Sequence, residues 1–265
     1  MKLENKVAVI TGGGRGIGRE IAMAYAEEGA DVTIAARTIT EIEAVAEEIK
    51  ALGGKALAVS TDVRLEEQVN HMVCRTLKEF GKIDILVNNA GGVFGTAMHP
   101  VWDITFQQWQ TVLEVNLTGT FLCLRAVAPQ MIRQKSGSII NVSTGVAQPG
   151  ISAVGFGAYA AAKCGVERLT KVLAAELATS NIRVNTLDPG GPVATRNVLD
   201  VVDVTTVKLP EGPVVRPNIV RPLAVFLASD DSVGITGESF NCKRWNLEHG
   251  FGDASQYWYS PARKY

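Results

Sequence analysis

Tyr159 and Lys163 are four residues apart in a proline-free stretch, Ala158 to Ala178, that is rich in Ala, Leu, Glu and Lys. This composition predicts a helix, on which residues four apart lie on one face. A cation a few ångströms from a phenol lowers the phenol pKa from about 10 toward neutrality, where the group both gives and takes protons. The spacing alone is a weak signal, because it also arises by chance. For the pair to carry out catalysis, the rest of the chain must supply a cofactor, a second hydroxyl, and a sheet that holds these groups in place.

A glycine-rich turn directly follows the first apolar run of the chain. Residues 7–10 are continuously apolar, which is typical of a strand buried on both faces of a parallel sheet. Thr11–Gly18 follows with the spacing Gly-x-x-x-Gly-x-Gly, and a helix is expected from Arg19 to Glu28. Strand, glycines and helix in succession predict a dinucleotide-binding turn, with the pyrophosphate at the helix N-terminus.

The end of the second expected strand, residues 32–36, bears on cofactor choice. A fold that selects NAD usually has an acid here for the ribose 2′-hydroxyl, whereas this chain has Ala36 followed by Arg37. A guanidinium binds a 2′-phosphate through two hydrogen bonds, and Arg15 in the glycine turn can approach the same phosphate. The two arginines favour NADP(H) over NAD(H), against the alternative that both are simply solvated.

Strands alternate with helices along the whole chain. Further strands are expected at residues 56–60, 83–87, 138–143, 183–187 and 238–242. Further helices are expected at residues 40–52, with Thr40 as N-cap and Glu43 completing a capping box, and at 66–80, 109–131, 158–178 and 219–229. Asn116 and Gly119 interrupt the helix at 109–131. The alternation predicts the α/β class, with one doubly wound parallel sheet in a single domain over residues 1–265.

Composition excludes several classes of function. The chain has 265 residues, of which 46% are hydrophobic and 20% charged, and its net charge is −1. These values give no electrostatic case for binding nucleic acid or an anionic membrane. The four cysteines lack disulfide or metal-type spacing, which indicates reduced thiols of a cytoplasmic protein without a metal site. We find no signal peptide and no apolar run that approaches a membrane span.

The order of the motifs resembles that of the classical short-chain dehydrogenase/reductase family. The motifs lie between residues 5 and 240, and they are the Thr11–Gly18 turn, Asp62-Val63, Asn88-Asn89-Ala90-Gly91, Asn116, Ser143, Tyr159 with Lys163, and Pro189-Gly190 with Thr195. The resemblance implies a Rossmann-type sheet of about seven parallel strands, with helices on both faces, and a nicotinamide cofactor. It also implies a homo-oligomer, and we expect a tetramer that pairs the Asn116 and Tyr159 helices across two-fold axes.

The resemblance assigns catalytic roles to four residues. Tyr159 is the general acid when a ketone is reduced, and Lys163 lowers its pKa and binds the nicotinamide ribose. Ser143 donates a hydrogen bond to the substrate oxygen and stabilises the charge that develops there. Asn116 holds a water that links Lys163 to solvent as a proton relay.

The resemblance also assigns cofactor contacts. Asp62 accepts a hydrogen bond from the adenine amino group, and the Val63 backbone completes that contact. The Val193 backbone and Thr195 hold the carboxamide. The complete set, with Tyr159 and Lys163, is Gly12, Arg15, Gly16, Ile17, Gly18, Arg37, Asp62, Val63, Asn89, Ala90, Gly91, Pro189, Gly190, Val193 and Thr195. Each residue alone also fits a purely structural role, but their joint occurrence in family order argues against that alternative.

Two regions depart from the family pattern. Asp188 replaces the usual small residue before Pro-Gly, and Gly191-Pro192 makes the following segment one residue longer. The C-terminal segment 241–265 replaces the usual ending, and the aromatic residues from the last strand onward are Phe240, Trp245, Phe251, Tyr257, Trp258, Tyr259 and Tyr265. We expect Trp245 and Tyr257-Trp258-Tyr259 to pack across a subunit interface and to bound the active-site cleft. The alternative is a tail folded onto its own subunit.

The expected activity is the interconversion of a carbonyl and a secondary alcohol by hydride transfer with NADP(H). Reduction is the favoured direction, because cellular NADPH pools are usually kept reduced. Residues 195–217 are the expected substrate lid, and their Val and Leu side chains suit an apolar or 3-oxoacyl substrate, or else only packing against the protein. A small cyclic alcohol is a second candidate substrate. A non-catalytic NADP(H)-binding regulator or scaffold is the alternative, which the intact Ser143, Tyr159 and Lys163 argue against.

Overall fold

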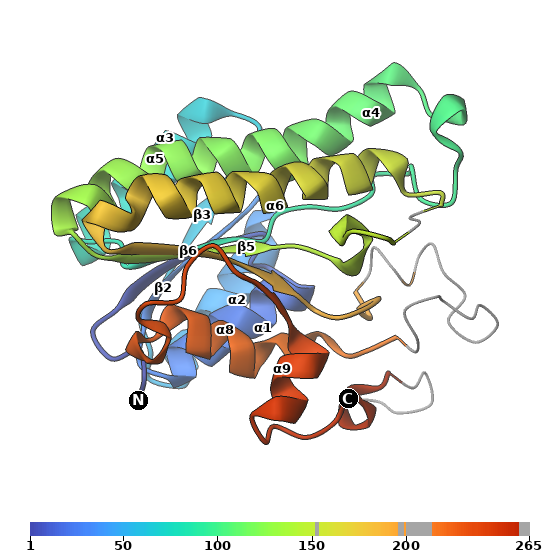
Figure 1. Cartoon of the computed structure of the whole chain (residues 1–265). Coiled ribbons are helices and arrows are strands. Elements are labelled where there is room, and N and C mark those ends of the chain that lie inside the picture. Colours follow the sequence, from blue (N-terminus) through green and yellow to red (C-terminus); the bar gives the residue numbers. More distant parts are fainter. Residues whose placement is uncertain (152–153, 196–198, 200–213, 260–265) are drawn as a thin grey trace.

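The structure is a computed structural model that describes residues 1–151, 154–195, 199 and 214–259. Seven parallel strands form one sheet in the order β3-β2-β1-β4-β5-β6-β7 (Figure 1). The strands are β1 (Val7–Thr11), β2 (Asp31–Ala36), β3 (Ala56–Ser60), β4 (Ile85–Asn88), β5 (Gly137–Val142), β6 (Ile182–Asp188) and β7 (Ser239–Asn241). The order reverses between β1 and β4, and doubly wound sheets bind ligands beside such a reversal, at the carboxyl ends of the strands.

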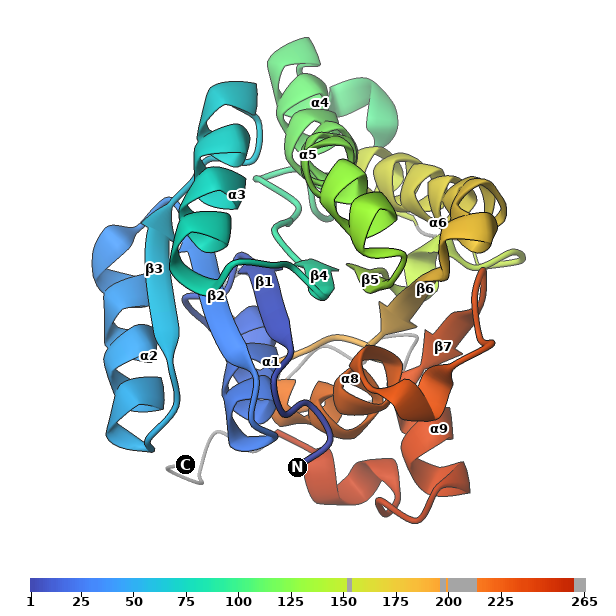
Figure 2. The same cartoon turned by 90° about the vertical axis from the view of Figure 1, so that its left-hand side faces the viewer.

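Helices cover both faces of this sheet (Figures 1 and 2). On one face lie α3 (Glu66–Phe80), α4 (Phe106–Leu113), α5 (Gly119–Gln134) and α6 (Gly157–Leu177). On the other lie α1 (Gly16–Glu27), α2 (Ile39–Ala51), α8 (Arg221–Ala228) and α9 (Cys242–Glu248). Short 3-10 helices occupy Val101–Asp103, Gly145–Ala147, Ala178–Ser180, Pro217–Val220, Asp230–Ser232 and Ala254–Tyr257. The predicted α/β class, parallel sheet and two-sided helix cover are confirmed.

Two apolar layers hold the helices to the sheet. The layer under α1, α2 and α8 includes the fully buried Ile21, Ile42 and Leu223. The layer under α3, α5 and α6 includes Val69 and Val127, also fully buried. All residues of β1, β4 and β5 are buried, which explains why these strands appear in the sequence as nearly continuous apolar runs.

The helix that contains Asn116 changes its hydrogen-bond pattern at that residue. Residues Glu114–Thr118 form one π-helical segment between α4 and α5, and the three segments run on from Phe106 to Gln134. The predicted interruption is therefore a π turn rather than a break. Such turns are rare and occur frequently at functional sites.

Two expectations about helices were wrong. Helix α2 begins at Ile39, its N-cap is Thr38, and no side chain caps it, so the predicted capping box of Thr40 with Glu43 does not form. The second wrong expectation is that no apolar run approaches a membrane span. The helix Phe106–Gln134 is long and apolar enough to pass a length-and-composition test for such a span. Half of its most apolar window is buried inside the protein, and core helices of soluble proteins pass the same test.

Candidate active site

The four predicted catalytic residues converge from two helices and one strand end. Ser143 directly follows β5, Tyr159 and Lys163 lie in the first turns of α6, and Asn116 lies in the π turn. The Lys163 Nζ donates to the carbonyl of Val142 at 2.7 Å, so α6 is fixed to the strand end that carries Ser143. The same Nζ lies 5.8 Å from the centroid of the Tyr159 ring. The structure therefore brings the predicted acid, its cation and the second hydroxyl together.

Lys163 is a buried cation. Its side chain is almost entirely removed from solvent, and this desolvation lowers the pKa of Lys163 to about 8. The negative charge of Glu167, one turn further along α6, opposes that change. The Glu167 carboxylate in turn accepts hydrogen bonds from Thr186 Oγ1 and Ser239 Oγ, which ties α6 to β6 and β7. Sequence reasoning missed Glu167, although its spacing from Lys163 places it on the same helix face.

The hydroxyl of Ser143 has no hydrogen-bond partner in the described part of the chain, although its oxygen is buried. The Ser143 backbone N–H is used, because it donates to the Leu187 carbonyl at 2.8 Å. A buried polar group that lacks a partner costs about 1–3 kcal/mol. The hydroxyl next to the Lys163 anchor is thus an available donor for an oxygen atom that enters the site.

Asn116 is fully buried and fixes the loop after β4. Its Oδ1 accepts from Gly92 N at 3.1 Å, and its Nδ2 donates to the carbonyls of Gly92 at 2.9 Å and Val112 at 2.8 Å. A Cβ on Gly91 would lie 2.5 Å from Asn116 Oδ1 and 3.6 Å from Lys163 Nζ. Asn116, Gly91 and Lys163 are therefore neighbours, and no side chain fits at position 91.

Thr11 joins the carboxyl ends of β1 and β4, on either side of the reversal in strand order. Its Oγ1 accepts from the backbone N–H groups of Asn89 at 3.0 Å and Ala90 at 3.1 Å. The Asn89 side chain donates back to the carbonyls of Thr11 and Gly12. Sequence reasoning included Thr11 in the Thr11–Gly18 turn but assigned it no separate role.

The glycine turn has the properties of a phosphate-binding turn. Gly12 and Gly16 have φ of 64° and 55°, values that favour glycine. A Cβ on Gly18 would overlap the carbonyl of Gly12. Helix α1 begins at Gly16 without a capping side chain among the described residues, so the N–H groups of its first turn, which includes Ile17, remain for a ligand. These features fit a dinucleotide pyrophosphate.

The two arginines expected at the 2′-phosphate have different environments. Arg15 Nη1 lies 3.2 Å from Glu41 Oε1 in the first turn of α2. Arg37 is exposed directly after β2, and its charge contributes to lowering the pKa of Asp62. Sequence reasoning missed Glu41 as the partner of Arg15, because an ion pair between α1 and α2 depends on how the two helices pack.

Asp62 also has a partner that the sequence did not reveal. Its carboxylate accepts from the Arg64 backbone and guanidinium, and the closest contact, Arg64 Nη2 to Oδ2, is 2.6 Å. The hydrogen bond from Arg64 is the main reason that the pKa of Asp62 lies below its usual value. Val63 is buried, and a Cβ on Gly119 would lie 2.6 Å from it. The Asp62-Val63 loop is therefore fixed before any ligand binds.

The segment after β6 reaches back to the glycine turn. A Cβ on Gly16 would lie 2.9 Å from Thr195 Cγ2, so Thr195 is next to the start of α1. Pro189 and Gly190 begin this segment, and Val193 is buried in the layer under α1. Of the predicted lid, residues 196–198 and 200–213 lie outside the described residues.

The expectation that Trp245 packs across a subunit interface was wrong. Its side chain is buried within its own chain, where it lies 5.1 Å from Phe226 and stacks on His249 at 4.2 Å. The aromatic density reflects a helix, α9, that docks on α8 and completes the core. Trp258 is 50% exposed, so its part of the prediction stays open, and residues 260–265 lie outside the described residues.

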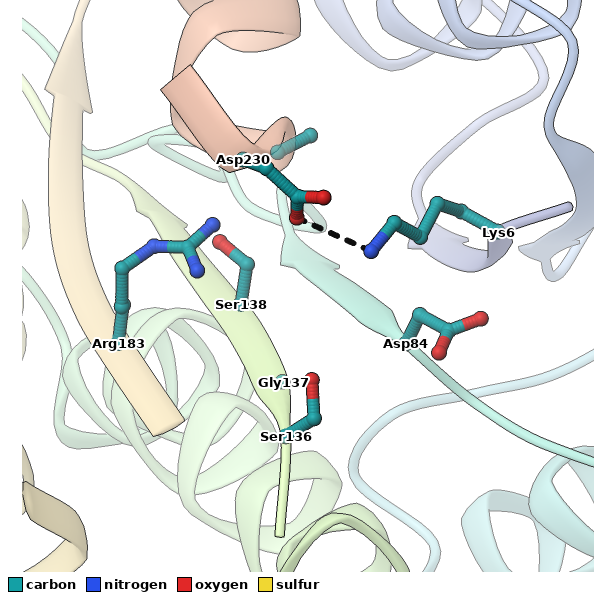
Figure 3. Close-up of a pocket in the computed structure, with 8 residues that line it drawn as sticks. Lys6, Asp84, Ser136, Gly137, Ser138, Arg183 and Asp230 are labelled. Carbon is teal, nitrogen blue, oxygen red and sulfur yellow. Dashed lines mark hydrogen bonds and ion pairs between the residues drawn. The ribbon is translucent and has the colours of Figure 1, made fainter. Parts of the chain in front are cut away.

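A small polar cavity lies at the opposite edge of the sheet (Figure 3). Its lining comes from the amino ends of the strands, with Lys6, Asp84, Ser138 and Arg183, and from Asp230 just after α8. Ser138 Oγ and Arg183 Nη2 donate to carbonyls at the end of α8, which is a helix C-cap. Ser143 and Tyr159 lie at the carboxyl edge of the sheet, so this cavity is remote from the candidate active site. The polar side chains that line it hold the end of α8.

Known proteins share this arrangement. A model of the short chain dehydrogenase family matches residues 6–202. The chain is 39% identical over 241 residues to the 3-oxoacyl-(acyl-carrier-protein) reductase FabG of Staphylococcus epidermidis, covering 89% of this chain and 97% of that one. It is 38% identical to the 3-oxoacyl-(acyl-carrier-protein) reductase of Synechocystis sp., with 90% and 96% covered. A crystal structure of a short-chain type dehydrogenase/reductase from Mycobacterium marinum superposes with a TM-score of 0.84 at 37% identity, over 91% of this chain and 94% of that one.

The match extends from the glycine turn through Tyr159 and Lys163. The site geometry, the sheet order and the sequence similarity all agree. The chain therefore belongs to the short-chain dehydrogenase/reductase family and is an oxidoreductase.

Proposed function

We propose that this protein is an NADP(H)-dependent reductase of 3-oxoacyl thioesters or closely similar apolar carbonyl compounds. The observation that carries the proposal is the buried, unpartnered hydroxyl of Ser143 beside the Tyr159–Lys163 pair. A carbonyl oxygen placed there accepts from Ser143 and takes a proton from the Tyr159 phenol. Donors aimed at developing negative charge in a buried site commonly supply the largest part of a rate acceleration.

Lys163 and Asn116 act on the proton of Tyr159. The buried ammonium of Lys163 favours the phenolate that remains after Tyr159 gives up its proton. Asn116 holds the loop that packs beside Lys163, and we assign to this region the water-filled route by which the proton is replaced. NADP(H), when bound, supplies the hydride in reduction and accepts it in oxidation.

The glycine turn, Asp62-Val63, Asn89-Ala90-Gly91 and Pro189–Thr195 hold the dinucleotide in this proposal. Arg37 is exposed beside the proposed adenine end of the cofactor site, and position 36 carries no acidic residue. Both features support binding of a 2′-phosphate. Arg15 joins it when its pair with Glu41 opens, a small cost because exposed ion pairs contribute only about 0–1 kcal/mol.

Apolar side chains beside the site support the substrate class. Met98, Val101 and Trp102 are exposed, and Ile151 and Val154 are exposed across from them. The two segments meet, since a Cβ on Gly155 would lie 2.8 Å from Met98 Cα. They flank the start of α6, which carries Tyr159. The relatives named above are reductases of 3-oxoacyl groups, which agrees with an apolar acyl chain in this place.

The proposal also covers the domain organisation, the oligomeric state and the location of the enzyme. We propose a single domain over residues 1–265, a homotetramer, and a cytoplasmic location, which the four free cysteines support. The small-molecule carbonyl is the only partner besides other copies of the chain.

Oxidation of NADPH and NADH by the purified protein, against a panel of carbonyl compounds, tests the function. The panel contains a 3-oxobutyryl thioester, longer 3-oxoacyl thioesters and small cyclic ketones. We expect turnover with NADPH and a 3-oxoacyl thioester. Tyr159→Phe should lower kcat by about 10²–10⁴-fold and Ser143→Ala by about 10²–10³-fold, with NADPH affinity little changed.

Three outcomes would contradict the proposal. Equal use of NADH would remove the role given to Arg37. Near-normal turnover in Tyr159→Phe would remove Tyr159 from the chemistry. Tight NADPH binding without turnover of any carbonyl in the panel would favour the non-catalytic regulator or scaffold instead.

A further inference from the structure

Asp188 is a buried carboxylate at the entrance to the segment that follows β6. It is only 3% exposed, and burial raises the pKa of its side chain. Its Oδ1 accepts from the Gly190 backbone N–H at 2.9 Å, and its Oδ2 accepts from Asn241 Nδ2 at 3.1 Å. One side chain thus connects the Pro189–Thr195 segment with the C-terminal part of the chain.

Asn241 is the other end of this connection. It is the last residue of β7, pairs in register with Asp188, and is the N-cap of α9. Its Oδ1 accepts from Arg244 N at 3.2 Å, so both ends of the amide are used. A Cβ on Gly190 would lie 2.7 Å from that oxygen, and Gly190 has φ of 85°. The segment therefore turns tightly over the start of α9.

A second contact joins the same two regions through Val215. Val215 N donates to the carbonyl of Pro192 at 2.9 Å, and Ala194 N donates to the carbonyl of Val215 at 2.8 Å. On its other side, this strand-like piece binds the C-terminal segment, because Arg216 N donates to Tyr257 O at 2.6 Å and Tyr259 N donates to Val214 O at 2.8 Å. Two isolated β-bridges, Val193 with Val215 and Val215 with Trp258, thus join the segments 192–194, 214–216 and 257–259.

The C-terminal part is itself anchored in the core. Cys242 and Trp245 of α9 are buried, and Trp245 also stacks on Phe251 at 5.5 Å. Asn246 Nδ2 donates to the carbonyl of Ile219 at 2.9 Å. The support behind Pro189–Thr195 is therefore part of the same apolar layer as α8.

We propose that the C-terminal segment Asn241–Tyr259 is a fixed part of the cofactor site of its own subunit. Asp188 and Asn241 are positioning residues, and they hold Pro189–Thr195 at the nicotinamide end without touching the cofactor. The segment 257–259 does the same through residues 214–216. This inference rests on the proposed function, because it takes Pro189–Thr195 to be the segment that binds the nicotinamide.

A charge-swap series tests the role of Asp188. Asp188→Asn places two amides against each other, and Asn241→Asp places two carboxylates against each other. The double variant Asp188→Asn with Asn241→Asp keeps an acceptor for Gly190 N, reverses the bond between the two side chains, and keeps an acceptor for Arg244 N. We expect each single variant to raise the NADPH Kd by about tenfold, and the double variant to restore it to near the wild-type value.

Two truncations test the segment 257–259. A chain that stops after Gln256 loses the contacts of Tyr257 and Tyr259, and a matched control stops after Tyr259. The shorter chain should bind NADPH more weakly by about tenfold, and the control should bind as the full chain does. If the shorter chain fails to fold, the swap series still decides the proposal, because the double variant keeps the full length of the chain.

The outcomes separate this inference from the proposed function. A wild-type protein that binds neither NADPH nor NADH overturns the proposed function, and this inference with it. Single variants that lower Tm but bind NADPH with the wild-type Kd overturn this inference alone. So does a double variant that recovers its Tm but not its NADPH affinity. Recovery of both in the double variant supports it.

Discussion

A buried hydroxyl without a hydrogen-bond partner lowers the stability of a fold by about 1–3 kcal/mol, and a buried lysine lowers it more. Neither group therefore serves to stabilise the fold. Ser143 and Lys163 are both of this kind, and they adjoin the same strand end. Two polar side chains nearby are satisfied: Asn116 makes three hydrogen bonds to backbone, and Thr11 holds the loop after β4. At the residue scale, Ser143 and Lys163 are buried at a cost in stability, whereas Asn116 and Thr11 are hydrogen-bonded and position the loops around them.

The pH dependence of reduction should report on Lys163. Burial lowers its pKa to about 8, so the ammonium is lost as the pH rises through that value. The ammonium stabilises the phenolate left on Tyr159 after proton transfer, and its loss should therefore lower kcat/KM for carbonyl reduction above about pH 8. Arginine stays protonated in proteins. Lys163→Arg should be less active at neutral pH but should lack this alkaline fall. An unchanged fall in Lys163→Arg would assign the titration to another group.

Residue types in order identified the chemistry, but the partners of those residues could not be predicted. Glu41 on Arg15 depends on how two helices approach each other. Arg64 on Asp62 and Glu167 beside Lys163 are only two and four residues away, and they were missed although the spacing is local. Asp188 was noticed only as a departure from the family pattern, and its bond to Asn241 crosses more than fifty positions of sequence. Pairwise side-chain contacts of this range have no periodic signal in a sequence.

At the element scale, periodicity and apolar runs were sufficient to place the strands and the helices within a few residues. The prediction of the residues that cap the helix ends was less successful. Thr40 and Glu43 have the types of a capping box, but α2 starts at Ile39 and passes that position. Helix α9 was not expected, because its seven residues are too few to show a period. Its aromatic residue, Trp245, was assigned to an interface when it completes the core.

The glycine turn provides a test at this scale. A Cβ on Gly18 would overlap the Gly12 carbonyl and lie 2.5 Å from Asn89 Nδ2, so Gly18→Ala must displace the turn that starts α1. We expect this variant to raise the NADPH Kd by about tenfold or more and to lower Tm, because overpacking of this kind costs about 1–3 kcal/mol.

Gly53→Ala is the matched control for Gly18→Ala. Position 53 has open space around it, and its φ of 87° imposes a backbone cost of only about 1–2 kcal/mol on alanine. It should lower Tm while leaving the NADPH Kd unchanged. Wild-type affinity in Gly18→Ala would mean that the turn does not hold the dinucleotide.

At the scale of the whole molecule, apolar side chains remain exposed on the helices of one face. Phe106 of α4 is 73% exposed, Phe121 of α5 is 45% exposed, and Val172 of α6 is 39% exposed. These helices lie side by side in both views (Figures 1 and 2). Exposed apolar side chains on adjacent helices suit a subunit interface. They agree with the expected pairing of the Asn116 and Tyr159 helices about a two-fold axis.

The assembly should therefore depend on this face. In sedimentation we expect the wild-type chain to be a tetramer, and Phe121→Asp combined with Val172→Asp to dissociate it. An uncompensated charge buried at an interface costs about 3–5 kcal/mol, so the dissociation constant should rise by at least about 100-fold. Leu52→Asp is the matched control, since Leu52 is 66% exposed at the end of α2, on the other face of the sheet. It should leave the tetramer intact. A double variant that sediments as the wild type does would exclude α5 and α6 from the interface, and the exposed Trp258 would then be the next surface to test in the same way.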